Sequence, residues 1–253
     1  MAVKWSQSAS RVLAILEKVA EYQPVGITEL ARLLEADKSA VQRALTTLAR
    51  DAWIRVAPGK PTRWEVTARI QAIAHVALGT NDLRHRARPV LQALRDKTGE
   101  SVLLNVPERG RFIVSDVLES RHYLRVVPLA GTIVAPLGSA TGRAMLPYMS
   151  RERQIEFLGA APDAVQMKEF TATVARGYSI SSGEVVAGST NLAAPIIEAD
   201  GRPVGAVLVS APTERLLPRD YSRIGTLVCA AARKLSRGPA SAVSIKRKEF
   251  VLA

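Results

Sequence analysis

The sequence predicts an α+β protein with a small helical N-terminal domain, which ends in a two-stranded ribbon, and a larger C-terminal domain built on an antiparallel sheet. Three observations predict this class. Apolar residues recur at helical spacing in three short segments of the first 51 residues. Alternating residues then flank the turn sequence PGKP at 58–61. Beyond residue 100, short strand-like runs are interspersed with helical segments.

The first two predicted helices stand close together in the sequence. The segment SASRVLAILEKVAEY at 8–22 carries an apolar stripe, and Ser8 or Ser10 is suited to cap its N-terminus. A second helix, ELARLLE, is expected after an N-cap at Thr28. The connection EADK between this second helix and the third is too short to be a hinge, so the second and third helices are typical of a helix–turn–helix.

The third predicted helix, KSAVQRALTTLARD, follows an N-cap at Asp37 and has two distinct faces. Val41, Leu45 and Leu48 share an apolar stripe at i, i+4 and i+7. Side chains of the kinds that reach phosphates and base edges in a major groove lie off that stripe: Lys38, Ser39, Gln42, Arg43, Thr46 and Thr47. A solvated polar face is the alternative interpretation of the same residues.

Residues 53–67, WIRVAPGKPTRWEVT, predict the ribbon. Apolar and polar positions alternate on both sides of the turn, and the cations Arg55, Lys60 and Arg63 suit a wing near the DNA backbone or minor groove. Three helices followed by such a hairpin indicate a winged helix. The tight turn EADK between the second and third helices would set the angle at which the third helix enters a major groove.

Composition limits the classes of function. The chain has 253 residues, 47% of them hydrophobic, and a net charge of +12, which favours a polyanionic partner. We expect a cytoplasmic protein without a membrane partner, because no run approaches eighteen apolar residues and the N-terminus lacks a signal-peptide core. The single cysteine, Cys229, lies among apolar neighbours and is expected to be a buried structural thiol.

The C-terminal two thirds predict alternating strands and helices. A helix at 81–99 follows a helical linker closed by Gly79, and Pro89 should kink or restart it. Asp200-Gly201 is a strong hairpin signal within the last strand segment. Strands are expected at 101–108, 111–118, 122–128 and 192–212, and helices at 139–149, 151–159, about 163–176 and 219–237.

Several motifs resemble those of the IclR-type bacterial transcription regulators. They are SASRVLAILE with the helix–turn–helix, TGESVLLNVPERGRFIVSDVLES, APLGSATGRAML, ARGYSISSGEVVAG and LAAPIIEADGRPVGAVLVSAP. Each motif alone is weak, but their order and spacing extend over about two hundred residues. The resemblance implies a winged helix-turn-helix, a linker helix, and a GAF-like effector domain with an antiparallel sheet.

The resemblance also implies partners and domain limits. We expect double-stranded operator DNA, a small organic acid effector, and a homodimer or tetramer, with no cofactor or metal. Repression is the expected direction, although activation uses the same parts. The expected domains are 1–67 for DNA binding, 68–80 for the linker helix, 81–238 for effector binding and oligomerisation, and 239–253 for a flexible basic tail.

The expected effector site combines the resemblance with local pattern. Backbone N–H groups at the start of the helix near Ala140, Thr141 and Gly142 would favour a carboxylate. Strand alternation puts Leu208 with Ser210 on one face and Asn191 with Ala193 on another. The positions that match the family pocket are Tyr123, Ala140, Thr141, Ser181, Asn191, Leu208 and Ser210.

This chain departs from the family pattern at the segment SISSGE, where many relatives carry an acidic pair. Only Glu184 keeps a carboxylate there, so the family role mapped onto Ser181 is not secured. A pocket bordered by Tyr123 and Leu208 should be larger and more apolar than one for a two- or three-carbon keto acid. We therefore expect an aromatic or medium-chain carboxylate.

Two other classes of function remain as alternatives. An enzyme lacks support, because His75, His85 and His122 are scattered and no metal-site spacing or nucleophile elbow is present. A non-specific architectural DNA-binding protein fits the charge but gives the large C-terminal domain no purpose. The linker segment 68–80 indicates an oligomer, because it carries more apolar surface than a single connecting helix needs. The apolar residues are Ile70, Ile73, Ala74, Ala77 and Leu78.

Overall fold

The structure, a computed structural model, describes residues 6–78 and 83–237, with the side chains of 75–78 excepted. It divides into two compact units, residues 1–80 and 81–253, each with its own hydrophobic core. In the described ranges no helix is long and apolar enough to cross a membrane. Gly79 and the predicted basic tail at 239–253 lie outside the described residues.

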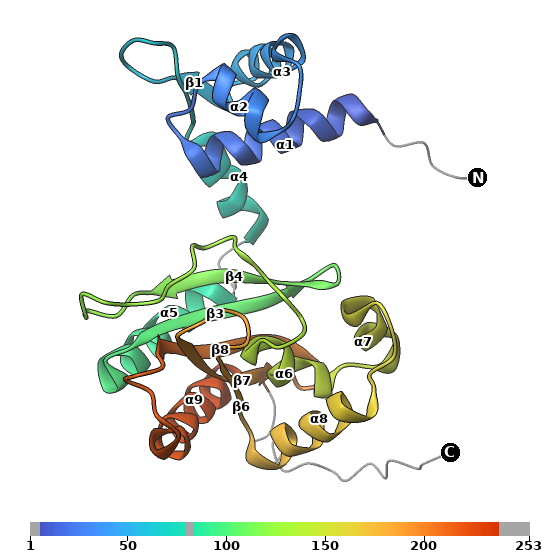
Figure 1. Cartoon of the computed structure of the whole chain (residues 1–253), viewed down its shortest axis with the longest axis vertical. Coiled ribbons are helices and arrows are strands. Elements are labelled where there is room, and N and C mark those ends of the chain that lie inside the picture. Colours follow the sequence, from blue (N-terminus) through green and yellow to red (C-terminus); the bar gives the residue numbers. More distant parts are fainter. Residues whose placement is uncertain (1–5, 79–82, 238–253) are drawn as a thin grey trace. The chain divides into compact units, whose positions relative to one another are not determined.

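The N-terminal unit confirms the predicted winged helix-turn-helix (Figure 1). The apolar stripe of its third helix is buried, with Val41 and Leu45 closed off completely, and it packs against Ile15 and Leu30 of the first two helices. The elements are α1 (Gln7–Tyr22), α2 (Ile27–Leu33), α3 (Lys38–Arg50), β1 (Ile54–Val56), β2 (Trp64–Val66) and α4 (Arg69–Leu78).

Two of the three helix N-caps in this unit differ from the predictions. Helix α1 is capped by Ser6, whose hydroxyl accepts from the Ala9 N–H, rather than by Ser8 or Ser10. Helix α2 begins one residue before Thr28, with Gly26 at its N-cap. Asp37 does occupy the N-cap position of α3, but its side chain accepts no capping hydrogen bond. These shifts leave the helix–turn–helix intact because its packing, not its caps, fixes it.

The described part of the C-terminal unit contains a six-stranded antiparallel sheet in the order β5-β4-β3-β8-β7-β6. The strands predicted at 101–108 and 111–118 are present with those bounds, and the Asp200-Gly201 turn separates the last two strands. The strands are β3 (Ser101–Glu108), β4 (Arg111–Leu118), β5 (Ile133–Val134), β6 (Ser179–Ser182), β7 (Ser189–Ile197) and β8 (Pro203–Pro212).

A β-bulge in β4 decides which side chains face which side of the sheet. Asn105 of β3 pairs with Val114, but Leu104 pairs with Asp116, so Ser115 is the extra residue. One inserted residue reverses the alternation of a strand. Val114 therefore faces the same side as Asn105, whereas Asp116 faces the opposite side with Leu104 and accepts hydrogen bonds from Arg88 at 2.9 and 3.0 Å.

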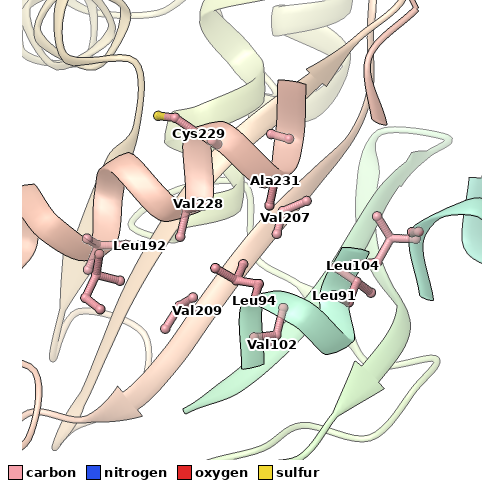
Figure 2. Close-up of a cluster of buried hydrophobic side chains, with 14 of the residues drawn as sticks. Leu91, Leu94, Val102, Leu104, Leu192, Val207, Val209, Val228, Cys229 and Ala231 are labelled. Atoms are coloured by element: carbon pink, nitrogen blue, oxygen red, sulfur yellow. The ribbon is translucent and has the colours of Figure 1, made fainter. Parts of the chain in front are cut away.

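Helices cover both faces of this sheet. Helices α5 (Leu83–Thr98) and α9 (Tyr221–Leu235) pack on one face, where Leu91, Val207 and Val228 are among the fully buried side chains (Figure 2). The other face is covered by α6 (Ala140–Met145), η1 (Leu146–Tyr148), α7 (Arg151–Leu158) and α8 (Ala164–Arg176), and η2 (Pro218–Asp220) precedes α9.

Three local predictions for this unit need correction. Residues 122–128 form no strand, and the short strands β5 and β6 were not predicted. Pro89 does not restart the helix around it. Helix α5 continues from Leu83 to Thr98, because Pro89 is on the exposed side while Ala87 and Leu91 anchor both neighbouring turns in the core.

Candidate functional site

The polar face of α3 is fully available on the surface of the N-terminal unit. The side chains of Lys38, Gln42 and Arg43 are exposed and have no hydrogen-bond or ion-pair partner among the described residues. Ser39, Thr46 and Thr47 are exposed as well. The two threonine hydroxyls donate to the carbonyls of Gln42 at 2.9 Å and Arg43 at 3.0 Å, so toward an outside partner they offer acceptors.

The three cations of the ribbon differ in their surroundings. Arg55 donates to Glu65 on the neighbouring strand at 2.7 Å. Arg63 donates to the carbonyl of Pro24 at 2.7 Å and lies 3.6 Å from the Glu29 carboxylate, so it attaches the ribbon to the start of α2. Lys60, at the turn, is exposed without a partner in the described part of the chain. Of the three, only Lys60 combines exposure with a free charge.

The C-terminal unit contains a cavity of about 300 Å³ between the sheet and α6. Its walls carry no charged side chain: apolar groups alternate with hydroxyls and two amides. The lining residues are Leu103, Asn105, Val114, Val126, Val127, Pro128, Thr132, Ile133, Val134, Ala135, Ser139, Ala140, Thr141, Ser181, Val185, Val186, Ser189, Asn191, Leu208 and Ser210.

The sheet register brings most of the predicted effector residues to this cavity. Asn191 pairs with both Ser181 and Ser210 across β6, β7 and β8, and Ala193 pairs with Leu208. All of these side chains therefore lie on one face of the sheet, whereas the sequence suggested two faces. Ala140 and Thr141 close the cavity from α6.

Tyr123 does not border the cavity. Its side chain is 101% exposed, because the segment that contains it forms no strand and turns outward. Val126 and Val127, a few residues further along, take the place in the wall that was predicted for Tyr123. The segment is held by Arg215, which donates to the Leu124 carbonyl at 2.9 Å, and by Ser210, which donates to Val126 at 3.2 Å.

Gly142 does not line the cavity either. Its N–H donates to the Ser139 hydroxyl at 3.0 Å and so is not available to a carboxylate. A Cβ at this position would overlap the carbonyl oxygen of Pro136, which lies directly against the helix. The close approach predicted for the small residues GSATG is thus made by the chain's own backbone.

The hydroxyls of the cavity wall are mostly committed to the fold. Ser181 donates to the Gly138 carbonyl at 2.6 Å, while the Asn191 amide donates to Ser189 at 3.1 Å. Because an amide nitrogen has two hydrogens, Asn191 keeps one for another acceptor. Ser210 holds Val126 only through a 3.2 Å bond, which a better acceptor can replace.

Asn105 is a cavity residue that the sequence analysis missed. Its amide donates to the Thr141 hydroxyl at 2.5 Å, and both residues are buried. Its Oδ1 is buried without a hydrogen-bond partner among the described residues. The sequence signal was a single polar residue inside the apolar run SVLLNVP, on the same face of β3 as Leu103, but its contact with Thr141 of α6 comes from the fold.

An ion pair fixes the loop that forms one side of the cavity. Arg143 of α6 donates to both carboxylate oxygens of Glu184 at 2.6 and 2.5 Å, and to the Ile180 carbonyl at 2.7 Å. The hydrogen bonds that Arg143 donates to the Glu184 carboxylate raise the pKa of Arg143, against the opposing effect of burial. The loop after Glu184 supplies Val185 and Val186 to the wall.

The remaining residues singled out from the sequence are structural or exposed. Cys229 is buried, as predicted; burial raises the pKa of its thiol, which donates to Gly177 at 3.1 Å. His85 is exposed, and the side chain of His75 lies outside the described residues. Within the described ranges no three His, Cys, Asp or Glu side chains gather as metal ligands.

Comparison with known proteins covers both units. The family model described as the bacterial transcriptional regulator IclR C-terminal domain matches residues 75–237, and the IclR helix-turn-helix model matches residues 8–58. The chain is 28% identical over 244 residues to the transcriptional repressor IclR of Escherichia coli, covering 91% of this chain and 89% of that protein. It is also 28% identical to the regulator BhcR of Paracoccus denitrificans, covering 92% and 88%.

Solved structures show the same fold at low identity. An IclR transcriptional regulator from Alicyclobacillus acidocaldarius gives a TM-score of 0.77 at 20% identity, covering 92% of this chain and 98% of that one. An IclR homologue from Microbacterium hydrocarbonoxydans, solved with 4-hydroxybenzoate, gives 0.76 at 16% identity and covers 91% and 98%.

Proposed function

The chain belongs to the IclR family of bacterial transcriptional regulators, and from this premise we propose how it reads DNA and which ligand controls it. The N-terminal unit binds a specific operator through α3 and the ribbon. A small organic acid with an aromatic or other apolar body binds in the cavity of the C-terminal unit and changes operator affinity. We expect a repressor, in line with relatives that are named as repressors.

DNA reading is carried by the unpartnered polar face of α3. Arg43 would recognise guanine and Gln42 adenine, each at about 1–3 kcal/mol of discrimination for a good bidentate contact. Lys38 and Ser39 would contact the flanking phosphates, Thr46 and Thr47 would accept from donors on the base edges, and Lys60 would contact the backbone. Arg55 and Arg63, being tied to Glu65 and to α2, would contribute chiefly by holding the ribbon in place.

Ligand binding is carried by the neutral, largely apolar cavity with hydroxyls and amides at defined places. Leu103 and Leu208 would border the ligand body. The carboxylate would accept from the free Asn191 N–H and from Ser210, and Ala140 and Thr141 of α6 would close the cavity over the ligand body. The homologue solved with 4-hydroxybenzoate supports an aromatic acid as the first class to test.

Oligomerisation is proposed from the linker helix. In α4 the Ile73 side chain is 44% exposed, beside the partly buried Ile70. An apolar side chain exposed on a connecting helix suits a partner helix, so a dimer would present two copies of α3 to a pseudo-palindromic operator. Ala77 and Leu78, the other members of the predicted apolar set, have no described side chains. Sedimentation as a monomer at micromolar concentration contradicts this assignment.

Catalysis, cellular location and domain limits complete the proposal. No His, Cys, Asp, Glu or Lys lines the described cavity, which argues against an enzyme site there. A protein that acts on operator DNA works in the cytoplasm. We propose the functional limits 1–67, 68–80 and 81–238, with 239–253 as a basic tail.

Two experiments test the proposed function. The first is footprinting of the promoter next to the gene for this protein, compared with scrambled DNA, which separates specific recognition from an architectural role. Equal protection of both sequences contradicts specific recognition.

The second is a thermal-shift screen of aromatic and aliphatic acids, which tests ligand binding in the cavity. A ligand at one hundred times its Kd raises the free energy of unfolding by about 2.7 kcal/mol. A hit that is unaffected by the double substitution Asn191→Ala and Ser210→Ala does not bind where we propose.

A further inference from the structure

We propose that Asn105 forms a second polar end of the cavity and selects ligands that carry a hydrogen-bond donor, such as a hydroxyl, at the end remote from their carboxylate. This inference rests on the proposed effector cavity and adds to it the chemistry of the ligand's other end. It also adds a specificity-determining residue to those expected from the sequence.

The strand register separates Asn105 from the carboxylate end of the cavity. Asn105 pairs with Ala206 of β8, whereas Asn191 pairs with Ser210 of the same strand. Four residues along a strand span about 13 Å at about 3.3 Å each. Leu208 lies midway and pairs with Leu103. The cavity is therefore polar at both ends and apolar in the middle.

The hydrogen bonding of Asn105 defines what this second end accepts. The residue is 2% exposed, and one N–H of its Nδ2 donates to the Thr141 hydroxyl at 2.5 Å. Its Oδ1 is the only buried side-chain oxygen of the cavity wall without a partner among the described residues. A buried acceptor without a donor is unfavourable, so a ligand that supplies a donor there gains affinity over one that does not.

The same acceptor fixes the orientation of the ligand. A carboxylate placed against Asn105 Oδ1 would bring two acceptors together with no hydrogen between them. At the other end, Asn191 has an N–H to donate. Only the orientation that places the hydroxyl at Asn105 supplies the donor that Oδ1 lacks and gives the carboxylate the Asn191 N–H.

A purely structural role for Asn105 makes a different prediction. In that case its bond to Thr141 would serve to hold α6 against β3, and replacing the pair would lower stability without changing ligand preference. Asn105→Leu with Thr141→Val replaces both partners by apolar side chains of similar shape, an exchange that is close to neutral in stability. The double variant therefore separates selectivity from folding.

The test measures the affinities of 4-hydroxybenzoate, 4-methoxybenzoate and benzoate by isothermal titration calorimetry with the full chain. Wild type should bind 4-hydroxybenzoate about tenfold more tightly than either of the others, since the methoxy group accepts but does not donate. In Asn105→Leu/Thr141→Val the three affinities should agree within about twofold. Asn191→Ala is the matched control: it should weaken 4-hydroxybenzoate and benzoate by the same factor and keep their ratio.

Each contrary result has a distinct meaning. Equal binding of the three acids by wild type overturns the inference without any variant, as does methoxybenzoate matching the hydroxyl acid. A tenfold preference that survives in the double variant also overturns it, while the effector cavity stands. Failure of all three acids to bind wild type overturns the proposed aromatic effector together with the inference.

Discussion

The α3 face and the C-terminal cavity are the two surfaces through which we propose that this regulator binds DNA and its ligand, and they are built in opposite ways. On α3 the side chains are charged or polar, exposed, and for Lys38, Gln42 and Arg43 without any described partner. In the cavity the side chains are neutral, and the polar ones are mostly hydrogen-bonded to the chain itself, as Ser181 is to Gly138.

Because of this difference, recognition is separate from stability on the α3 face, whereas the two are coupled in the cavity. An exposed, unpartnered side chain contributes little to folding, so its removal should affect DNA binding alone. A cavity residue that also holds a loop or a helix cannot be changed without effects on both. The following experiments test that contrast, and they are ordered by the size of the change that each should cause.

Gly142→Ala should give the largest effect and should act on folding. Its Cβ would overlap the Pro136 carbonyl at the start of α6, so we expect a loss of about 3 kcal/mol in the stability of the C-terminal unit. Thermal or urea unfolding measures this loss. Gly26→Ala, where nothing lies within 4 Å, is the control, and an equally mild result for both would show that the helix can move away.

Arg43→Ala should weaken operator binding by about 1–3 kcal/mol and leave the unfolding temperature unchanged. The reason is that Arg43 is exposed and lacks a partner in the described structure. Fluorescence anisotropy at fixed salt, with operator and scrambled duplexes, measures the effect. Arg109→Ala, which removes an exposed arginine 94% accessible at its side chain, is the charge-matched control. Equal losses in the two variants would mean that net charge alone matters.

Lys60 and Arg63 should separate within the ribbon itself. Lys60→Ala should reduce the slope of log K for DNA binding against log salt concentration by about 1, the loss of one phosphate contact, and leave the free energy of unfolding unchanged. Arg63→Ala should instead lower the free energy of unfolding by about 1 kcal/mol, because it loses its bonds to Pro24 and Glu29. Salt titrations and urea unfolding of both variants provide the comparison; identical behaviour would contradict the assignment of separate roles.

The smallest expected effect concerns pH. No titratable side chain lines the described cavity, and a carboxylic acid ligand stays ionised above pH 6. Its affinity should therefore change less than about twofold between pH 6 and 8. Calorimetry across that range is the measurement. A tenfold fall toward either limit would reveal a titrating partner and would sink the picture of a neutral site.

The sequence predicted the α3 surface well because that surface is local. Spacing within one helix placed Val41 and Leu45 inside and Gln42 and Arg43 outside, and no distant contact changes this. For Arg63 the same spacing could not indicate a partner, since Pro24 is 39 positions away in the sequence. The position of an arginine or lysine in a strand pattern does not indicate whether the fold will bring a carboxylate or carbonyl partner to it.

The cavity was predicted only in part, because its walls depend on distant segments. The family resemblance located Asn191, Leu208 and Ser210, which the structure brings to one face. Asn105 was missed because the bulge in β4 and a contact with Thr141, 36 positions away, decide its surroundings.

Tyr123 was misplaced for a related reason. The alternation in HYLRVVP suggested a strand, but a strand also needs a neighbour to pair with, and this segment pairs with none of the described strands.

We propose that occupancy of the neutral cavity controls operator binding, and measuring the operator Kd with and without a saturating acid ligand from the thermal-shift screen tests this directly. Coupling of about 1–3 kcal/mol predicts a change of roughly 5- to 150-fold in wild type. The Asn191→Ala/Ser210→Ala variant should show less than a twofold change at the same ligand concentration. An unchanged operator Kd in wild type with the ligand bound, or an equal shift in the variant, would contradict the claim.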